Sequence, residues 1–204
     1  MTSRSARRGR PGHDQQAVIR AAVKCFDEHG YDATTMGMIA DRLDVSKSAL
    51  YHHVEGKEEL LTLALDTAFD ALDVGLVAVE SSSEPLDERF EAFLRDTVDI
   101  LVEYRPFVRL LLRLRGNTPA QQAALDKRRA FDARMIEVVR QAQVAGLLRD
   151  DLDPAVVGRL VFGAVNSTVE WFQPHGRVSP HELAEAVITL VFRGVGTSAS
   201  LSSS

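Results

Sequence analysis

Cysteine is almost absent from this chain, since Cys25 is the only one among 204 residues. A disulfide framework within the chain is therefore excluded. Cys25 falls on the apolar face of a predicted helix, and we interpret it as a buried residue without a chemical role. The sequence also lacks an apolar run long enough to span a bilayer and a signal-peptide pattern. We therefore expect a cytoplasmic protein that does not contact a membrane.

The motifs of common enzymes and metal sites are missing as well. There is no glycine-rich phosphate loop, no Gly-x-Ser-x-Gly turn and no His-Glu-x-x-His helix. His52 and His53 are neighbours on a predicted helix, so their side chains point about 100° apart and do not easily share a metal ion. No cysteine or carboxylate completes a tetrahedral site beside them. We expect no cofactor and no catalytic residue, and an enzyme remains the second hypothesis.

The net charge of −5 argues against a generally basic surface, but the charges are unevenly distributed. Residues 1–57 contain 9 Lys and Arg against 7 Asp and Glu, which gives +2. Residues 58–204 contain 15 against 22, which gives −7. A mildly basic end on an acidic body suits a protein that touches DNA at one end only.

Residues 34–57 contain two short helical patterns separated by a tight break. An apolar repeat with Ile39 and Ala40 follows Thr35, a suitable N-cap, and Ser46 is placed to cap the second helix. Two helices this short cannot each bury a face alone, but crossed over a short turn they form a helix-turn-helix. The outward residues of the second helix suit phosphates and base edges: Lys47, Ser48, Tyr51 and His52.

This stretch resembles the DNA-binding core of the TetR family of bacterial transcriptional repressors. The residues that match are Thr35, Ile39-Ala40, Val45-Ser46, Leu50 to His53, Lys57 and Leu60. Two positions depart from the family pattern. Asp44 stands where the turn usually has a small residue such as glycine, and Val54 replaces the usual phenylalanine. Aspartate tolerates a left-handed backbone better than most residues, so we expect the turn to form.

The resemblance implies a repressor that binds a near-palindromic operator in double-stranded DNA as a homodimer. The DNA contacts expected from it lie in the two short helices, at the start of the next helix and in the basic N-terminal arm: Thr35, Ser46, Lys47, Ser48, Tyr51, His52, His53, Lys57, Arg8 and Arg10. For the arm, insertion into a minor groove and a solvated basic tail remain open alternatives.

Helical periodicity continues to the end of the chain without a strand pattern, so the predicted fold class is all-α with about nine helices. A three-helix head is expected on a helical body. The predicted domains are a disordered basic arm at 1–12, a helix-turn-helix DNA-binding domain at 13–57, a ligand-binding and dimerisation domain at 58–196, and a disordered tail at 197–204.

The last two predicted helices are rich in small and apolar residues on more than one face. Such a pair needs a partner beyond the subunit's own core. In the family that the chain resembles, two such pairs form a four-helix dimer interface. The residues expected there are Val157, Gly163, Ala164, Ser167, Leu190 and Val191. A plain monomeric core is the alternative.

A small-molecule effector is expected to bind in the body. Arg105, Arg109 and Arg113 follow one helical face, which either is a salt-bridged surface or binds phosphates beside an apolar pocket. The expected ligand contacts are Phe90, Arg109, Arg113, Phe131, Met135 and Trp171, although the aromatic ones could equally be core.

The segment 147–183 has a resemblance of its own. It looks like the C-terminal region of TetR-type repressors of steroid-ring and phenylacetate catabolism, and its most specific piece is Trp171 to Pro174 followed by Gly176. Those repressors sense acyl-CoA or aryl-CoA esters, so the resemblance implies a CoA thioester as effector. A free hydrophobic drug or aromatic acid, or a scaffold protein without a ligand, are the alternatives.

Overall fold

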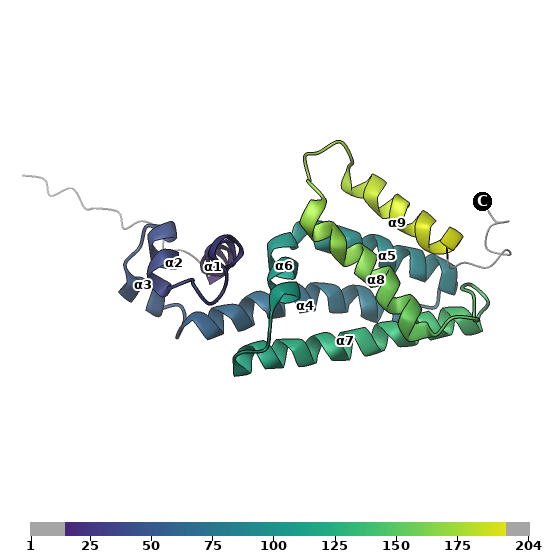
Figure 1. The fold of residues 1–204 in the computed structure, drawn as a ribbon, viewed down its shortest axis with the longest axis horizontal. Helices are drawn as coiled ribbons and strands as arrows, with labels where there is room; N and C mark the ends of the chain where they lie inside the picture. Colours follow the sequence, from purple (N-terminus) through teal and green to yellow (C-terminus); the bar gives the residue numbers. More distant parts are fainter. Residues whose placement is uncertain (1–14, 195–204) are drawn as a thin grey trace, which may run out of the picture. The chain divides into compact units, whose positions relative to one another are not determined.

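The computed structural model describes residues 15–194, which form nine helices and no strand (Figure 1). The all-α prediction is thereby confirmed. The chain divides between Ala64 and Leu65 into two compact units. The predicted arm and tail lie outside the described residues. Within these residues, no helix is both long and apolar enough to cross a membrane, and no cluster of His, Cys, Asp and Glu could hold a metal ion.

The first unit, called the head below, contains α1 (Gln15–His29), α2 (Met36–Leu43), α3 (Lys47–Tyr51) and the start of α4 (Lys57–Ser81). Helix α2 packs against α1 on one side and α3 on the other. Their inward side chains form a small core of fully buried residues, including Ala22, Phe26, Ile39 and Leu50. Burial of each large apolar side chain stabilises the head by about 1.5–3 kcal/mol.

The connection from α1 to α2 is closed by local hydrogen bonds. Gly30 ends α1 in the left-handed region at φ 81°, which glycine adopts without strain. The buried Thr34 hydroxyl lies 2.7 Å from the carbonyl oxygen of Gly30 and 3.1 Å from that of Cys25. These contacts tie the loop before α2 to the end of α1. Cys25 is buried as predicted, and burial raises the pKa of its thiol, which keeps it unreactive.

The second unit, the body, holds the rest of α4 and five further helices: α5 (Leu86–Glu103), α6 (Arg105–Arg113), α7 (Pro119–Val144), α8 (Pro154–Trp171) and α9 (Pro180–Gly194). Helix α5 packs against α9, and α7 packs against α8, which crosses it obliquely (Figure 1). Two apolar clusters fill the body, and their most enclosed side chains include Leu76, Phe90, Leu94 and Val98.

Several helix starts follow directly from the sequence. Asp153 caps α8 by accepting from the backbone N–H of Ala155 at 2.7 Å. Ser179 and Glu182 form a reciprocal capping box at the start of α9, with distances of 2.8 and 3.2 Å. At the start of α7 the capping box is incomplete. The side-chain oxygen of Gln121 accepts from the backbone N–H groups of Gly116 and Asn117, in the loop before the cap, and not from the N–H of Thr118.

Candidate nucleic-acid interface and effector site

The turn between α2 and α3 has the geometry of a helix-turn-helix. The Thr35 hydroxyl accepts from the N–H of Met38 at 3.3 Å, and the Ser46 hydroxyl accepts from the N–H of Ala49 at 3.1 Å. Asp44 adopts the left-handed conformation, with φ 55° and ψ 45°. Both predicted N-caps and the predicted turn are therefore confirmed. Each cap contributes about 1 kcal/mol to helix stability.

Helix α3 separates a buried side from an exposed one. Leu50 is only 1% exposed and anchors the helix to the head. The side chains that the sequence assigns to DNA contacts are exposed around it: Ser46, Lys47, Ser48, Tyr51, His52 and His53. The helix ends at Tyr51, two residues earlier than predicted, so His52 and His53 stand in the turn that follows. Thr35 is also exposed, at the start of α2.

Gly37 leaves space for the end of the Lys47 side chain, which was not predicted from the sequence. Gly37 is buried on α2, and a methyl group there would stand 2.7 Å from Cε of Lys47 and 3.1 Å from its Nζ. The lysine side chain therefore crosses α2 over the space that the glycine leaves. A signal was present in the sequence, because glycine inside a helix costs about 0.5–1 kcal/mol relative to alanine and needs a packing reason.

Lys57 has a structural role that was not anticipated. Its Nζ donates to the carbonyl oxygens of Tyr31 at 2.9 Å and Asp32 at 3.1 Å. The same ammonium lies 4.5 Å from the centre of the Tyr31 ring. Lys57 thus ties the start of α4 to the loop after α1, in addition to any contact with phosphate. The two arginines predicted as DNA contacts, Arg8 and Arg10, lie outside the described residues.

An apolar groove of about 510 Å³ lies between α8 and α9, and we call it the α8–α9 groove. Leu160, Trp171 and Leu190 line it and are 66%, 57% and 64% exposed. Of the residues predicted for the dimer interface, four line this groove: Ala164, Ser167, Leu190 and Val191. Exposed apolar surface of this kind marks a contact with another molecule.

Two of the residues predicted for the interface lie elsewhere. Val157 is 1% exposed and belongs to the body core, so its side chain is not available at the surface. Gly163 is exposed, but it borders a smaller hollow between α7 and α8. Leu160 and Trp171 take their place in the groove. The helical period indicates a stripe of apolar residues but does not tell which of two adjacent stripes faces the core.

The predicted ligand contacts do not line one hollow in the described structure. Phe90 is fully buried in the core, and Trp171 stands in the α8–α9 groove. Phe131 borders a hollow of about 250 Å³ beside α4, whereas Met135 borders the hollow between α7 and α8. Among the aromatic residues predicted as ligand contacts, Phe90 is therefore a core residue, which was the alternative interpretation.

The arginines of α6 hold the C-terminal end of α8. Nε of Arg105 and a terminal nitrogen of Arg109 donate to the carbonyl oxygen of Val169, at 2.7 and 2.9 Å. Arg113 lies 3.4 Å from the carboxylate of Glu170. Because a helix end leaves its last carbonyls open and carries partial negative charge, these guanidiniums stabilise it. The row is therefore engaged within the subunit, which favours the structural alternative over a phosphate site.

Comparisons with known proteins agree with this arrangement. Residues 18–64 match the family described as bacterial regulatory proteins, tetR family, and residues 83–195 match the tetracyclin repressor-like, C-terminal domain. A solved TetR-family transcriptional regulator from Streptomyces coelicolor A3 is 40% identical, with 88% of this chain and 91% of that chain covered and a TM-score of 0.80.

Two further relatives have more specific descriptions. The HTH-type transcriptional repressor KstR2 of Mycobacterium tuberculosis is 25% identical over 190 residues, which cover 87% of this chain and 90% of that protein. AibR, solved in complex with isovaleryl coenzyme A and operator DNA, is 25% identical over 87% of this chain and 97% of its own, with a TM-score of 0.75.

Proposed function

Because the chain belongs to the TetR family of transcriptional repressors, which bind operator DNA as dimers, we propose which of its residues contact the DNA and which ligand releases it. The family consists of DNA-binding regulators that are not enzymes, so the expectation of a non-enzymatic protein is confirmed. As a regulator of transcription it acts where the operator is, in the cytoplasm.

In this proposal α3 enters the major groove of a near-palindromic operator. Lys47 and Ser48 contact base edges, while Thr35, Tyr51, His52 and His53 hold phosphates beside them. The single observation that carries the assignment is the polarity of α3, which buries Leu50 and exposes a row of hydrogen-bond donors. The neighbouring Ser46 and Lys57 add contacts at the edges of the groove.

Lys47→Ala is expected to weaken operator binding and relax its sequence preference. A good contact to a base edge is worth about 1–3 kcal/mol, so the affinity for each half-site should fall about 5- to 150-fold. The operator can be selected from a random pool of duplexes, and binding measured by fluorescence anisotropy. Lys24→Ala removes the same charge from the exposed side of α1 and is expected to have little effect. Equal effects of the two substitutions would refute the assignment.

The effector in this proposal is a CoA thioester that binds in the body. One relative supports it: AibR was solved with isovaleryl coenzyme A and operator DNA. The resemblance of segment 147–183 points the same way. Helix α4 begins in the head and continues into the body, so a ligand that displaces its later turns can move its first turn. A free aromatic acid or hydrophobic drug is the second candidate.

Addition of a CoA ester to the repressor–operator complex is expected to lower DNA affinity. A ligand that prefers the released state by about 1–3 kcal/mol changes affinity about 5- to 150-fold, and the operator must weaken ligand binding by the same factor. Short-chain, long-chain and aromatic CoA esters are titrated beside their free acids, with fluorescence anisotropy of the DNA as readout. Release by the free acids alone would refute the CoA thioester and favour the second candidate.

A further inference from the structure

A small hollow between α7 and α8 carries two arginines for which the fold has no evident use. We call it the α7–α8 hollow; its volume is about 110 Å³. Arg128, Asp132 and Ile136 border it from α7, and Arg159, Phe162 and Asn166 border it from α8. The lining thus combines apolar and polar side chains. A water occupies about 30 Å³ of liquid, and an engineered cavity of about 150 Å³ binds benzene, so the space suits a small molecule or part of one.

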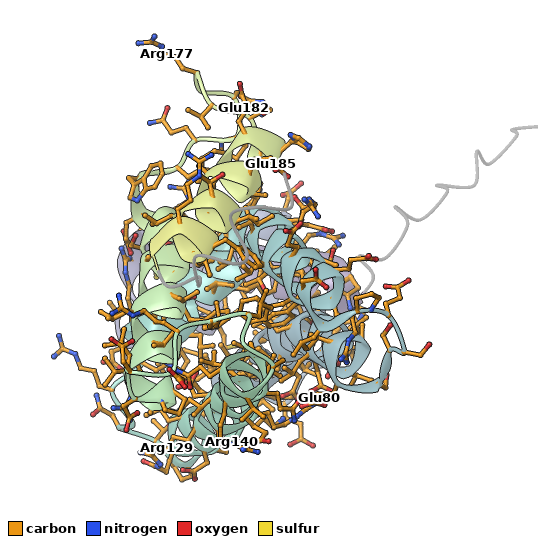
Figure 2. The ribbon with its side chains drawn as sticks, turned by 90° about the vertical axis from the view of Figure 1, so that its right-hand side faces the viewer. Glu80, Arg129, Arg140, Arg177, Glu182 and Glu185 are labelled. Atoms are coloured by element: carbon orange, nitrogen blue, oxygen red, sulfur yellow. The ribbon has the colours of Figure 1, made fainter. Side chains whose placement is uncertain are left out.

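Neither arginine of this hollow has a hydrogen bond or an ion pair with another described residue. Their neighbours on α7 behave differently. Lys127 pairs with Asp66, Arg129 with Asp126, and Arg134 with Asp73 and Glu80. Figure 2 shows Arg129 at the outer surface of the body. Residues 58–204 carry a net charge of −7, so carboxylates are plentiful, yet the half-buried Arg128 and the exposed Arg159 face the same hollow without pairing with one.

Asp132 does not neutralise the two arginines. It lies near both arginines, but it makes no ion pair with either in the described structure. Partial desolvation raises the pKa of its carboxyl group, and the charges of Arg128 and Arg159 only partly oppose this. Even with Asp132 ionised, two positive charges face one negative charge, so the hollow has a net positive charge. An anion with an apolar tail would complement both the polar and the apolar side chains of the lining.

We propose that the α7–α8 hollow binds the anionic group of a small acid, a carboxylate or a phosphate, between the guanidiniums of Arg128 and Arg159. Ile136 and Phe162 then contact a short apolar tail, and Asn166 offers a further donor. Guanidinium is suited to this role because it binds planar oxyanions through two parallel hydrogen bonds. This site requires neither operator binding nor a CoA effector, although either a free acid or a phosphate of a larger ligand could supply the anion.

Isothermal titration calorimetry of the full chain without DNA tests the proposal. The probes are valerate, inorganic phosphate and, as a neutral match for valerate, 1-pentanol. Valerate or phosphate is expected to bind, and R128Q and R159Q are each expected to weaken that binding at least about 10-fold, since a charge-assisted hydrogen bond is worth about 1.5–3 kcal/mol. Binding of valerate alone identifies a carboxylic acid as the source, and binding of phosphate alone identifies a phosphate.

Arg129→Gln is the matched control, because Arg129 is adjacent to Arg128 but pairs with Asp126 at the surface. It should leave binding unchanged. Melting curves of the three variants establish that each is folded. The proposal is wrong if neither anion binds, if 1-pentanol binds as well as valerate, or if the control weakens binding equally. It is also wrong if R159Q yields monomers in sedimentation velocity, since the guanidinium would then serve a contact between subunits.

Discussion

Replacing Ala164 with glutamate is expected to give monomers in sedimentation velocity and to lower operator affinity at least about 100-fold. Ala164 lines the α8–α9 groove and is exposed in the subunit, so the substitution has room in the monomer. In a dimer joined through this groove, the carboxylates would be buried in apolar surface without partners. A dimer binds two half-sites at once, and loss of that linkage removes a factor of about 10²–10⁴ in affinity.

The control for this experiment is Ala123→Glu, which places the same charge on the exposed side of α7. Alanine at this position is followed four residues later by Lys127, so a glutamate there is compatible with the helix. The control should remain dimeric and bind operator normally. A dimeric Ala164→Glu variant with full operator affinity would show that the subunits associate through another surface.

Arg109→Ala is expected to destabilise the unliganded protein, with a fall in melting temperature of about 3–12 °C. Arg109 is 17% exposed and donates to the carbonyl of Val169 in the last turn of α8. A hydrogen bond from a charged group contributes about 1.5–3 kcal/mol, and for a chain of this length each kcal/mol shifts the melting temperature by about 2–4 °C. Differential scanning calorimetry measures the effect.

The outcome also decides between the two interpretations of the α6 arginines that the sequence left open. Arg115→Ala serves as the control, because Arg115 is exposed just beyond α6 and its replacement removes the same charge. The melting temperature of this variant should equal that of the unchanged protein. If Arg109→Ala melts like the control but loses its response to CoA esters, Arg109 binds phosphate and does not stabilise α8. If Arg109→Ala lowers the melting temperature, any loss of its response to CoA esters results from the destabilised end of α8 instead.

The head could be predicted from the sequence because its structure depends on local chemistry. Thr35 and Ser46 each cap the helix that starts at the next residue, and Asp44 forms the left-handed turn between them. These roles require only the nearest few residues along the chain. The DNA contacts assigned to the exposed residues of α3 remain predictions.

The body could be predicted only in outline, because its details depend on contacts between distant segments. Val157 and Leu160 are both apolar and three residues apart on α8, yet one enters the core and the other faces the groove. The hydrogen bonds of Arg105 and Arg109 depend on where the end of α8 lies, because their acceptor belongs to a residue more than 50 positions later in the sequence. No local pattern encodes these relationships, and the arginines of the α7–α8 hollow were missed for the same reason.

The space above Gly37 has a consequence for redesign of the operator preference. Lys47 belongs to α3, but the end of its side chain lies over Gly37 of α2, so the operator preference proposed for Lys47 depends on both helices. If α3 were grafted into a relative with a larger side chain at the position of Gly37, the end of the lysine side chain would have to shift, and with it the base contact proposed for Lys47. We therefore expect sequence preference to transfer more completely when both helices are exchanged together.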